Sequence, residues 1–256
     1  SPVSASTREK APRCSASSIA SGDVPSTGTP ASFNRCASSS ERAISNCQPG
    51  LKGVSLGNFL IKRVAEQLKR ELPQGWDGDV PKFEPADGNI ATRKASSKVI
   101  QWAAGAVPEL VGGSADLAPS TLTLIDDAGS VKAGDYGGRN LHFGIREHGM
   151  GAIVNGLVLH GLRAFGAGFF IFSDYMKASL RLAAIMHIPS TFVFTHDSIG
   201  LGEDGPTHQP IEQLAHLRAV PNLYMVRPAG ANETALAWRF AIEQTTTPVA
   251  LALSRQ

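Results

Sequence analysis

Apolar residues recur along residues 91–256 in short runs that alternate with stretches of helical spacing. The short runs are nearly continuous in apolar character, which is typical of strands buried on both faces. The intervening stretches repeat apolar residues every three to four positions, which predicts helices packed on a sheet. The predicted order is helix Thr92–Ala106, strand Glu109–Val111, strand Leu141–Ile145, helix His148–His160, strand Arg163–Phe172, helix Tyr175–Met186, strand Thr191–Thr195, helix Ile211–Ala219, strand Leu223–Val226, helix Glu233–Gln244 and strand Val249–Leu253. This alternation predicts an α/β domain with an open, mostly parallel sheet and helices on both faces.

The residues before this domain lack the alternation and divide at residue 50. Residues 1–50 are rich in Ser, Ala, Pro and Thr, a composition that buries too little apolar surface to offset chain entropy. We expect a disordered extension there, or a stretch that is not native coding sequence. Residues 51–90 carry an apolar helical period and then several prolines, which predicts a helix followed by a linker. The apolar positions of that helix are Leu56, Phe59, Leu60, Val64 and Leu68.

Composition narrows the functional classes. The hydrophobic fraction of 42% suffices for a core, and a formal charge of +2 with no basic run does not suggest nucleic acid. No apolar stretch is long enough to predict a membrane-spanning helix. The cysteines, Cys14, Cys36 and Cys47, have neither a disulfide framework's pattern nor metal-ligand spacing. We therefore expect a cytoplasmic protein that binds no membrane and no nucleic acid.

Polar side chains gather directly after the predicted strands. They are Gly112–Asp116 after the first strand, Arg146–His148 after the second, Ser173–Tyr175 after the third, His196 and Asp197 after the fourth, Arg227 after the fifth, and Ser254 and Arg255 after the sixth. In open α/β sheets, ligands bind outside the carboxyl ends of the strands. Six such groups predict one binding site along that edge of the sheet.

The longest of these clusters is the loop of residues 196–210. It holds two histidines, His196 and His208, together with three acids and three glycines. Glycines allow a backbone to approach a ligand closely. Either histidine alone would be read as a hydrogen-bonded surface residue, but the two in one loop favour an active site.

The sequence from about residue 66 to the C-terminus resembles the transketolase family, and the resemblance is strongest from residue 91. The matching blocks, in the same order and spacing as in the family, are residues 91–96, 112–120, 142–150, 196–210 and 252–256. They correspond to the family's middle, pyrimidine-binding domain. The resemblance implies transfer of a two-carbon ketol unit between sugar phosphates in the pentose phosphate pathway, with thiamine diphosphate as cofactor.

The resemblance also implies roles for individual residues on the cofactor side. Glu147 is implied to share a proton with a ring nitrogen of the cofactor and, with His208, to be catalytic. The other implied cofactor contacts are Phe169, Phe172, Tyr175 and Asp116. Without the resemblance, Glu147 would be read as an ion pair with Arg146 or as a helix N-terminal acid. One of the three aromatic residues would likewise be read as strand core.

The substrate side follows from the same resemblance. The positions that match the family's substrate contacts are Arg93, Ser120, His196, Asp204, His208 and Arg255. Two guanidinium groups and a hydroxyl suit a phosphate dianion, because arginine offers bidentate charged hydrogen bonds. Alone, Arg93 would be read as a solvated charge at a helix N-terminus.

The family's metal-diphosphate motif, Gly-Asp-Gly followed by a distant Asn, is missing from the sequence, so no metal ligand is assigned. We expect Mg²⁺ or Ca²⁺ and the cofactor diphosphate to bind through a diphosphate-binding domain on another chain, in a homo- or hetero-oligomer. The isolated chain is then expected to be inactive. Three alternatives stay open: an inactive truncated fragment, an assembly protein that kept the fold, and a related thiamine-diphosphate enzyme such as dihydroxyacetone synthase.

Overall fold

The computed structural model describes residues 71–202 and 204–255. The predicted extension over residues 1–50 and the predicted helix around Leu56–Leu68 lie outside the described residues. The fold below is that of the remaining chain, which contains the predicted α/β domain.

Six strands form one parallel sheet in the order β2-β1-β3-β4-β6-β5. The strands are β1 (Leu110–Ser114), β2 (Asn140–His142), β3 (Arg163–Phe169), β4 (Thr191–Thr195), β5 (Tyr224–Val226) and β6 (Val249–Leu253). The helices are α3 (Thr92–Ala106), α4 (Ala118–Thr121), α5 (Glu147–Leu159), α6 (Ser173–Ile185), α7 (Gln213–Arg218) and α8 (Ala231–Glu243). Short 3₁₀ turns are η2 (Pro85–Asp87), η3 (Phe170–Phe172), η4 (Ile199–Leu201) and η5 (Pro206–His208). The predicted fold class is confirmed.

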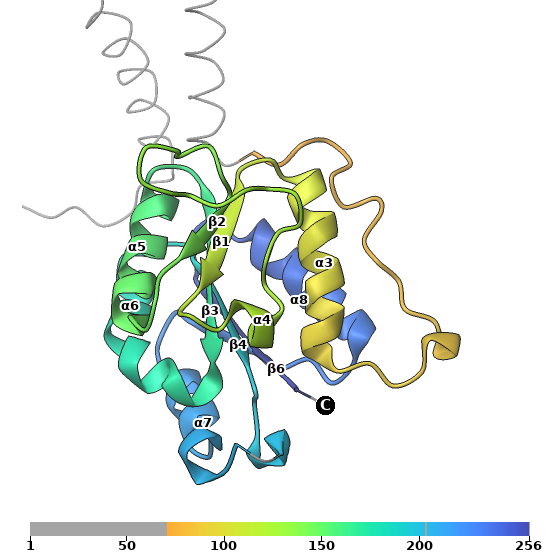
Figure 1. Ribbon diagram of the computed structural model, residues 1–256, viewed down its shortest axis with the longest axis vertical. Helices are drawn as coiled ribbons and strands as arrows, with labels where there is room; N and C mark the ends of the chain where they lie inside the picture. Colours follow the sequence, from red (N-terminus) through yellow and green to blue (C-terminus); the bar gives the residue numbers. More distant parts are fainter. Residues whose placement is uncertain (1–70, 203, 256) are drawn as a thin grey trace, which may run out of the picture. The chain divides into compact units, whose positions relative to one another are not determined.

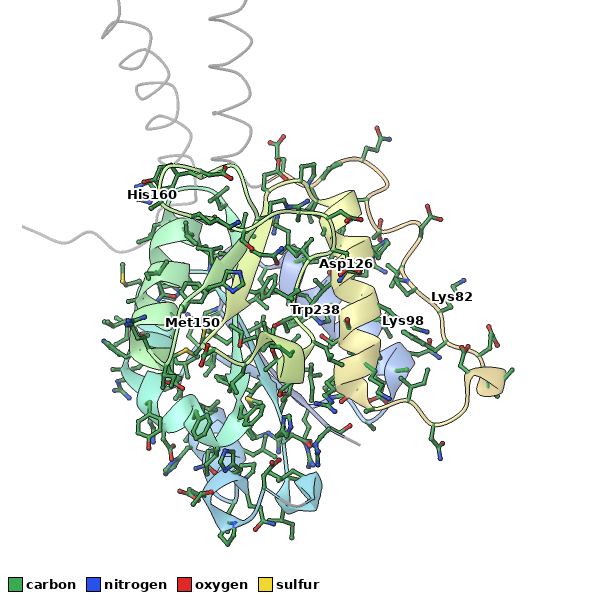
Figure 2. The ribbon with its side chains drawn as sticks, in the orientation of Figure 1. Lys82, Lys98, Asp126, Met150, His160 and Trp238 are labelled. Carbon is green, nitrogen blue, oxygen red and sulfur yellow. The ribbon has the colours of Figure 1, made fainter. Side chains whose placement is uncertain are left out.

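Helices cover both faces of the sheet. Helices α3 and α8 pack together on one face, and α5 and α6 pack together on the other (Figure 1). Each face has its own apolar core, marked in Figure 2 by Trp238 on the α3–α8 side and Met150 on the α5–α6 side. The indole of Trp238 is fully buried, and its N–H donates to the Ser96 hydroxyl at 2.7 Å, which satisfies the one polar atom that this ring carries. Among the described residues, no helix is both long enough and apolar enough to cross a membrane.

Local predictions differ from the structure at several places, and the predicted strand Leu141–Ile145 is the shorter β2 (Asn140–His142). Gly112 and Gly113, predicted to follow the first strand, lie inside β1. Residues 170–172, predicted as the end of a strand, form η3 and lead directly into α6. The short helix α4 was not foreseen, because its four residues contain a proline and are too few to show a period.

Gly112 and Gly113 allow β1 to pack closely against its two neighbouring strands, β2 and β3. A Cβ on Gly113 would lie 1.7 Å from the carbonyl oxygen of Leu141 on β2, and one on Gly112 would lie 2.4 Å from the ring of Phe165 on β3. Side chains at these two positions would force β1 away from both of its neighbours.

We expect Gly113→Ala to lower the free energy of unfolding by about 3 kcal/mol or more, because backbone would have to move to accept the methyl group. Gly105→Ala is the matched control. Gly105 lies in α3, and a Cβ there would meet nothing within 4 Å. That substitution is expected to raise stability by about 0.5 kcal/mol. Urea unfolding of the two variants measures both values, and equal effects would contradict this packing role.

The segment predicted as a linker, 76–89, is irregular but packs against the α3–α8 face. The Phe83 side chain is buried, and its backbone exchanges two hydrogen bonds of 2.9 Å with the Asn232 amide on α8. Trp76 packs against Trp102 of α3 with ring centroids 5.6 Å apart. These contacts fix the approach of the chain to Thr92, where α3 begins.

Candidate functional site

All six strands run parallel, so their carboxyl ends lie along one edge of the sheet. The N-terminus of α3 reaches the same edge, because the Arg93 amide donates to the Ser254 carbonyl at 3.2 Å. The Thr92 and Ser254 side chains reinforce this junction with their own hydrogen bonds. Arg93, at the start of the domain, is thereby placed beside Arg255 at its end.

Aromatic side chains from β3, η3 and α6 form one continuous group with the 196–210 loop. The rings of Phe169 and Phe172 are stacked, with centroids 5.9 Å apart and planes at 13°. Tyr175 continues the group at 6.1 Å from Phe172, and His208 meets both phenylalanine rings edge-on at 5.9 and 5.3 Å. Phe169 is buried, Phe172 is half-buried and Tyr175 is exposed. The group therefore presents an aromatic surface that is open toward solvent.

Two cationic side chains, Arg93 at the start of α3 and Arg255 after β6, lie at the same edge of the sheet. Arg93 Nη1 donates to the Ser120 carbonyl at 2.6 Å, and Arg255 donates to the Leu201 carbonyl. Burial and the neighbouring charge of Arg255 lower the pKa of Arg93, and Asp204 opposes this effect. Among buried side-chain polar atoms of the described residues, Arg93 Nε alone has no hydrogen-bond partner. Two like charges and an unsatisfied donor favour an anion between them.

His196 connects the aromatic and cationic groups. Its ring is buried and lies 3.8 Å from that of Phe169, and its Nδ1 pairs with the Thr195 hydroxyl at 2.9 Å. Its backbone has φ of 58°, a left-handed conformation that is uncommon for a residue with a side chain. Burial, followed by the positive charges of Arg93 and Arg255, lowers its pKa to about 4. The ring is therefore neutral near pH 7 and can both donate and accept a hydrogen bond.

The pKa of His196 makes stability depend on pH. An unfolded histidine takes up its proton near pH 6.5, whereas the folded one does so near pH 4. The unfolded state therefore binds more protons between these values, and stability falls as the pH falls. Between pH 7 and pH 4.5 the free energy of unfolding decreases, and we expect His196 to account for about 2 kcal/mol of that decrease.

Urea unfolding of the wild type and of His196→Gln at the two pH values measures this share. The variant is expected to lose about 2 kcal/mol less than the wild type. His160→Gln is the control, since His160 is exposed at the end of α5, and it should behave as the wild type (Figure 2). An identical loss in His196→Gln and the wild type would contradict the assignment.

Glu147 is the first residue of α5 and is half-buried. The guanidinium of Arg146 donates to the Phe143 carbonyl at 3.0 Å, and none of the ion pairs found in residues 71–202 and 204–255 includes Glu147. The ion-pair interpretation thus finds no support, while the position remains that of a helix N-terminal acid. His148, the next residue, is held by the Ser179 hydroxyl of α6, which fixes the first turn of the helix.

The two candidate aspartates are both exposed. Asp116 follows β1 and has φ of 62°, which turns the chain toward α4. Asp204 lies in the loop, and its charge acts on both Arg93 and His196. The Ser120 carbonyl, not its hydroxyl, receives the Arg93 bond. A ligand contact by that hydroxyl stays a prediction.

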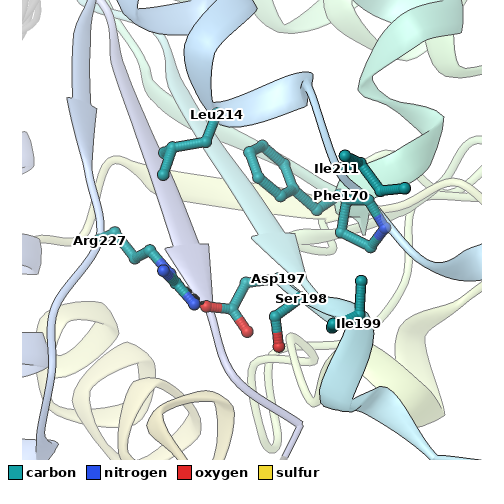
Figure 3. Close-up of a pocket in the computed structure, with 8 residues that line it drawn as sticks. Phe170, Asp197, Ser198, Ile199, Ile211, Leu214 and Arg227 are labelled. Carbon is teal, nitrogen blue, oxygen red and sulfur yellow. Dashed lines mark hydrogen bonds and ion pairs between the residues drawn. The ribbon is translucent and has the colours of Figure 1, made fainter.

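The sequence did not predict an ion pair between Asp197 and Arg227. Arg227 Nε lies 2.6 Å from Asp197 Oδ2, and the Asp197 side chain is only 6% exposed. Figure 3 shows the pair on one side of a hollow of about 250 Å³, with Phe170, Ile211 and Leu214 on the other. Asp197 also lines a second hollow of about 240 Å³, next to Arg255. The only hint of this pair in the sequence is that an acid directly follows a histidine of the candidate site. The partner of that acid cannot be inferred without the strand order.

The fold and the site define a class: a parallel α/β domain that holds an aromatic surface and a pair of neighbouring arginines at the carboxyl edge of its sheet. The family model described as the transketolase pyrimidine binding domain matches residues 88–256. The chain belongs to this family. A second model, the malonyl-CoA decarboxylase C-terminal domain, matches residues 31–79, most of which lie outside the described residues.

Individual relatives agree with the family. The transketolase of Bacillus subtilis is 54% identical over 198 residues, which cover 75% of this chain and 30% of that protein. A transketolase from Pichia stipitis in complex with sedoheptulose 7-phosphate is 42% identical with a TM-score of 0.74, over 88% of this chain and 32% of that one. A split-gene transketolase, solved as an inactive β4 tetramer, is 29% identical with a TM-score of 0.54, over 66% of this chain and 53% of that one. The chain spans about 30% of the length of the curated relatives that it matches.

Proposed function

We propose that this chain supplies the pyrimidine-domain half of a transketolase active site, which transfers a two-carbon ketol unit between sugar phosphates. The observation that carries the proposal is the unsatisfied Arg93 Nε within electrostatic reach of Arg255 and of the buried His196, whose ring contacts Phe169 of the aromatic group. A phosphorylated sugar and an aromatic cofactor need these two surfaces side by side.

The aromatic surface fits the pyrimidine of thiamine diphosphate. Phe172 and Tyr175 offer partly open ring faces for stacking, which contributes about 0.5–1.5 kcal/mol per pair beyond burial. Glu147, at the start of α5, provides a carboxyl group that can exchange a proton with a ring nitrogen. When bound, the cofactor would supply a carbon nucleophile for the transfer of the ketol unit. Phe169, whose ring stacks on that of Phe172, would support this stack, and Asp116 is proposed as a further contact.

The cationic side fits the phosphate of the sugar. Arg93 and Arg255 would bind the phosphate oxygens, with the Ser120 hydroxyl as a further donor. The neutral His196 would donate one more hydrogen bond. His208, against the aromatic surface, would face the reacting end of the sugar, and the exposed Asp204 would accept from a sugar hydroxyl.

The metal and the cofactor diphosphate would bind outside the described residues. Within the described ranges, no three histidine, cysteine, aspartate or glutamate side chains are grouped as a metal site. We propose that a second chain supplies the diphosphate-binding domain with its Mg²⁺ or Ca²⁺, in an oligomer located in the cytoplasm. The related split-gene transketolase was solved as an inactive β4 tetramer, which supports a division of the active site between chains.

Calorimetric titration with thiamine diphosphate and Mg²⁺ tests this division. Binding should be weak to the isolated chain, and at least about a hundredfold tighter when a diphosphate-domain chain is present, because the charged diphosphate contacts are then restored. Equal affinity with and without that second chain would contradict the proposal. It would instead favour a non-catalytic assembly protein.

A further inference from the structure

The backbone of His196 is left-handed, so an additional interaction must hold it there. The conformation is disfavoured for residues other than glycine and persists only where the surroundings enforce it. The His196 ring contacts Phe169 at the end of β3 and Thr195 at the end of β4, which both precede His196 in the chain. The loop that follows must therefore be anchored separately.

Asp197 provides that anchor. Its nearly buried carboxylate is bound by Arg227, which follows β5. In the strand order, β6 lies between β4 and β5, so the ion pair spans the end of β6 and joins two loops that are not neighbours. Asp197 lines both hollows, the one that it shares with Ile211 and Leu214 (Figure 3) and the one that it shares with Arg255.

We propose that the Asp197–Arg227 ion pair is a positioning element that holds the His196 ring over Phe169, facing the two arginines that bind phosphate. The pair itself touches no ligand. The phosphate part of this inference rests on the proposed function, whereas the orientation of the ring does not. If the pair is broken, the chain after His196 relaxes, the ring turns toward solvent and the anion site loses one donor.

The pKa of His196 reports the position of its ring. The groups that act on it are Arg93, Arg255, Asp204 and His208, in addition to burial. Losing the Arg227 charge would by itself raise the pKa of His196, whereas losing the Asp197 charge would by itself lower it. Movement of the ring into water raises the pKa in both cases, so a rise in both variants identifies movement.

The experiment follows the labelled histidine side chains of the whole chain by NMR in Arg227→Gln, Asp197→Asn and Arg227→Lys. The pKa of His196 is expected to rise from about 4 toward 6.5 in the first two variants, and less in Arg227→Lys, which keeps the charge. The dissociation constant for inorganic phosphate should increase about fivefold or more in the first two, as one hydrogen bond is lost. Arg239→Gln is the control, because Arg239 is ion-paired and 42% exposed like Arg227 but lies on α8.

A pKa that stays near 4 in folded Asp197→Asn would overturn the proposal, even if the variant were less stable, because the pair would then be only structural. That variant keeps the shape of the side chain, so it decides the question if Arg227→Gln does not fold. Absence of phosphate binding in the wild type would instead contradict the proposed function. The histidine titration would still test the positioning role.

Discussion

Replacing Glu147 with glutamine is expected to reduce ketol transfer by the complemented enzyme about a thousandfold. An amide occupies the same space as the carboxyl group but cannot exchange a proton with the cofactor ring, and proton transfer by a positioned side chain typically contributes 10²–10⁴ in rate. Steady-state assays with a sugar-phosphate donor measure the effect. The substitution should change kcat and leave the fold intact, because none of the ion pairs in the described residues involves Glu147.

The chain offers a matched control for the simpler interpretation of Glu147. Glu233 is also an acid in the first turn of a helix, and its carboxylate accepts from the Ala229 amide at 2.7 Å. Glu233→Gln removes a charge at the equivalent helix position, on a residue to which no cofactor or substrate contact is assigned. If Glu147→Gln keeps more than about a tenth of the activity, as Glu233→Gln should, then Glu147 is only a helix N-terminal acid.

Replacing Arg93 with glutamine is expected to raise KM for a phosphorylated ketose about a hundredfold, with a small change in kcat. Hydrogen bonds to a charged group contribute about 1.5–3 kcal/mol each, and Arg93 has an unsatisfied donor as well as its charge to offer. For an unphosphorylated ketose, KM should hardly change, because the missing group is the one that Arg93 binds.

Kinetics with the two ketoses, and with Arg218→Gln as control, measure this selectivity. Arg218 is exposed at the end of α7 and should leave both KM values unchanged. An equal rise of KM for both ketoses in Arg93→Gln would contradict a phosphate role. It would show instead that the substitution disturbs the junction between α3 and Ser254.

The fold could be predicted where local pattern and tertiary environment agree. The bounds of α3, β4 and β6 are as predicted, because these segments have an uninterrupted period or a continuous apolar run. Gly112 and Gly113 were predicted to follow the first strand, but they lie inside β1. Their role depends on how closely Leu141 and Phe165 approach, which no local pattern records.

The residues of the candidate site could largely be predicted from the sequence, whereas the contacts between them could not. The resemblance supplied Glu147, His196 and the arginines, and the structure brings Arg93, His196 and Arg255 within electrostatic reach of one another. The Asp197–Arg227 pair could not be predicted, because it requires β6 to lie between β4 and β5. Contacts that depend on strand order cannot be predicted from the spacing of residues along the chain.

Ketol transfer from a ketose phosphate to an aldose phosphate, in the presence of thiamine diphosphate and Mg²⁺, tests the central claim most directly. The chain should be assayed alone, mixed with a chain that carries a diphosphate-binding domain, and mixed with that chain after Glu147→Gln substitution. We expect no transfer by the chain alone, transfer by the wild-type mixture, and none above background with the variant. A wild-type mixture in which both chains are folded and associated, but which transfers no ketol unit, would contradict the account.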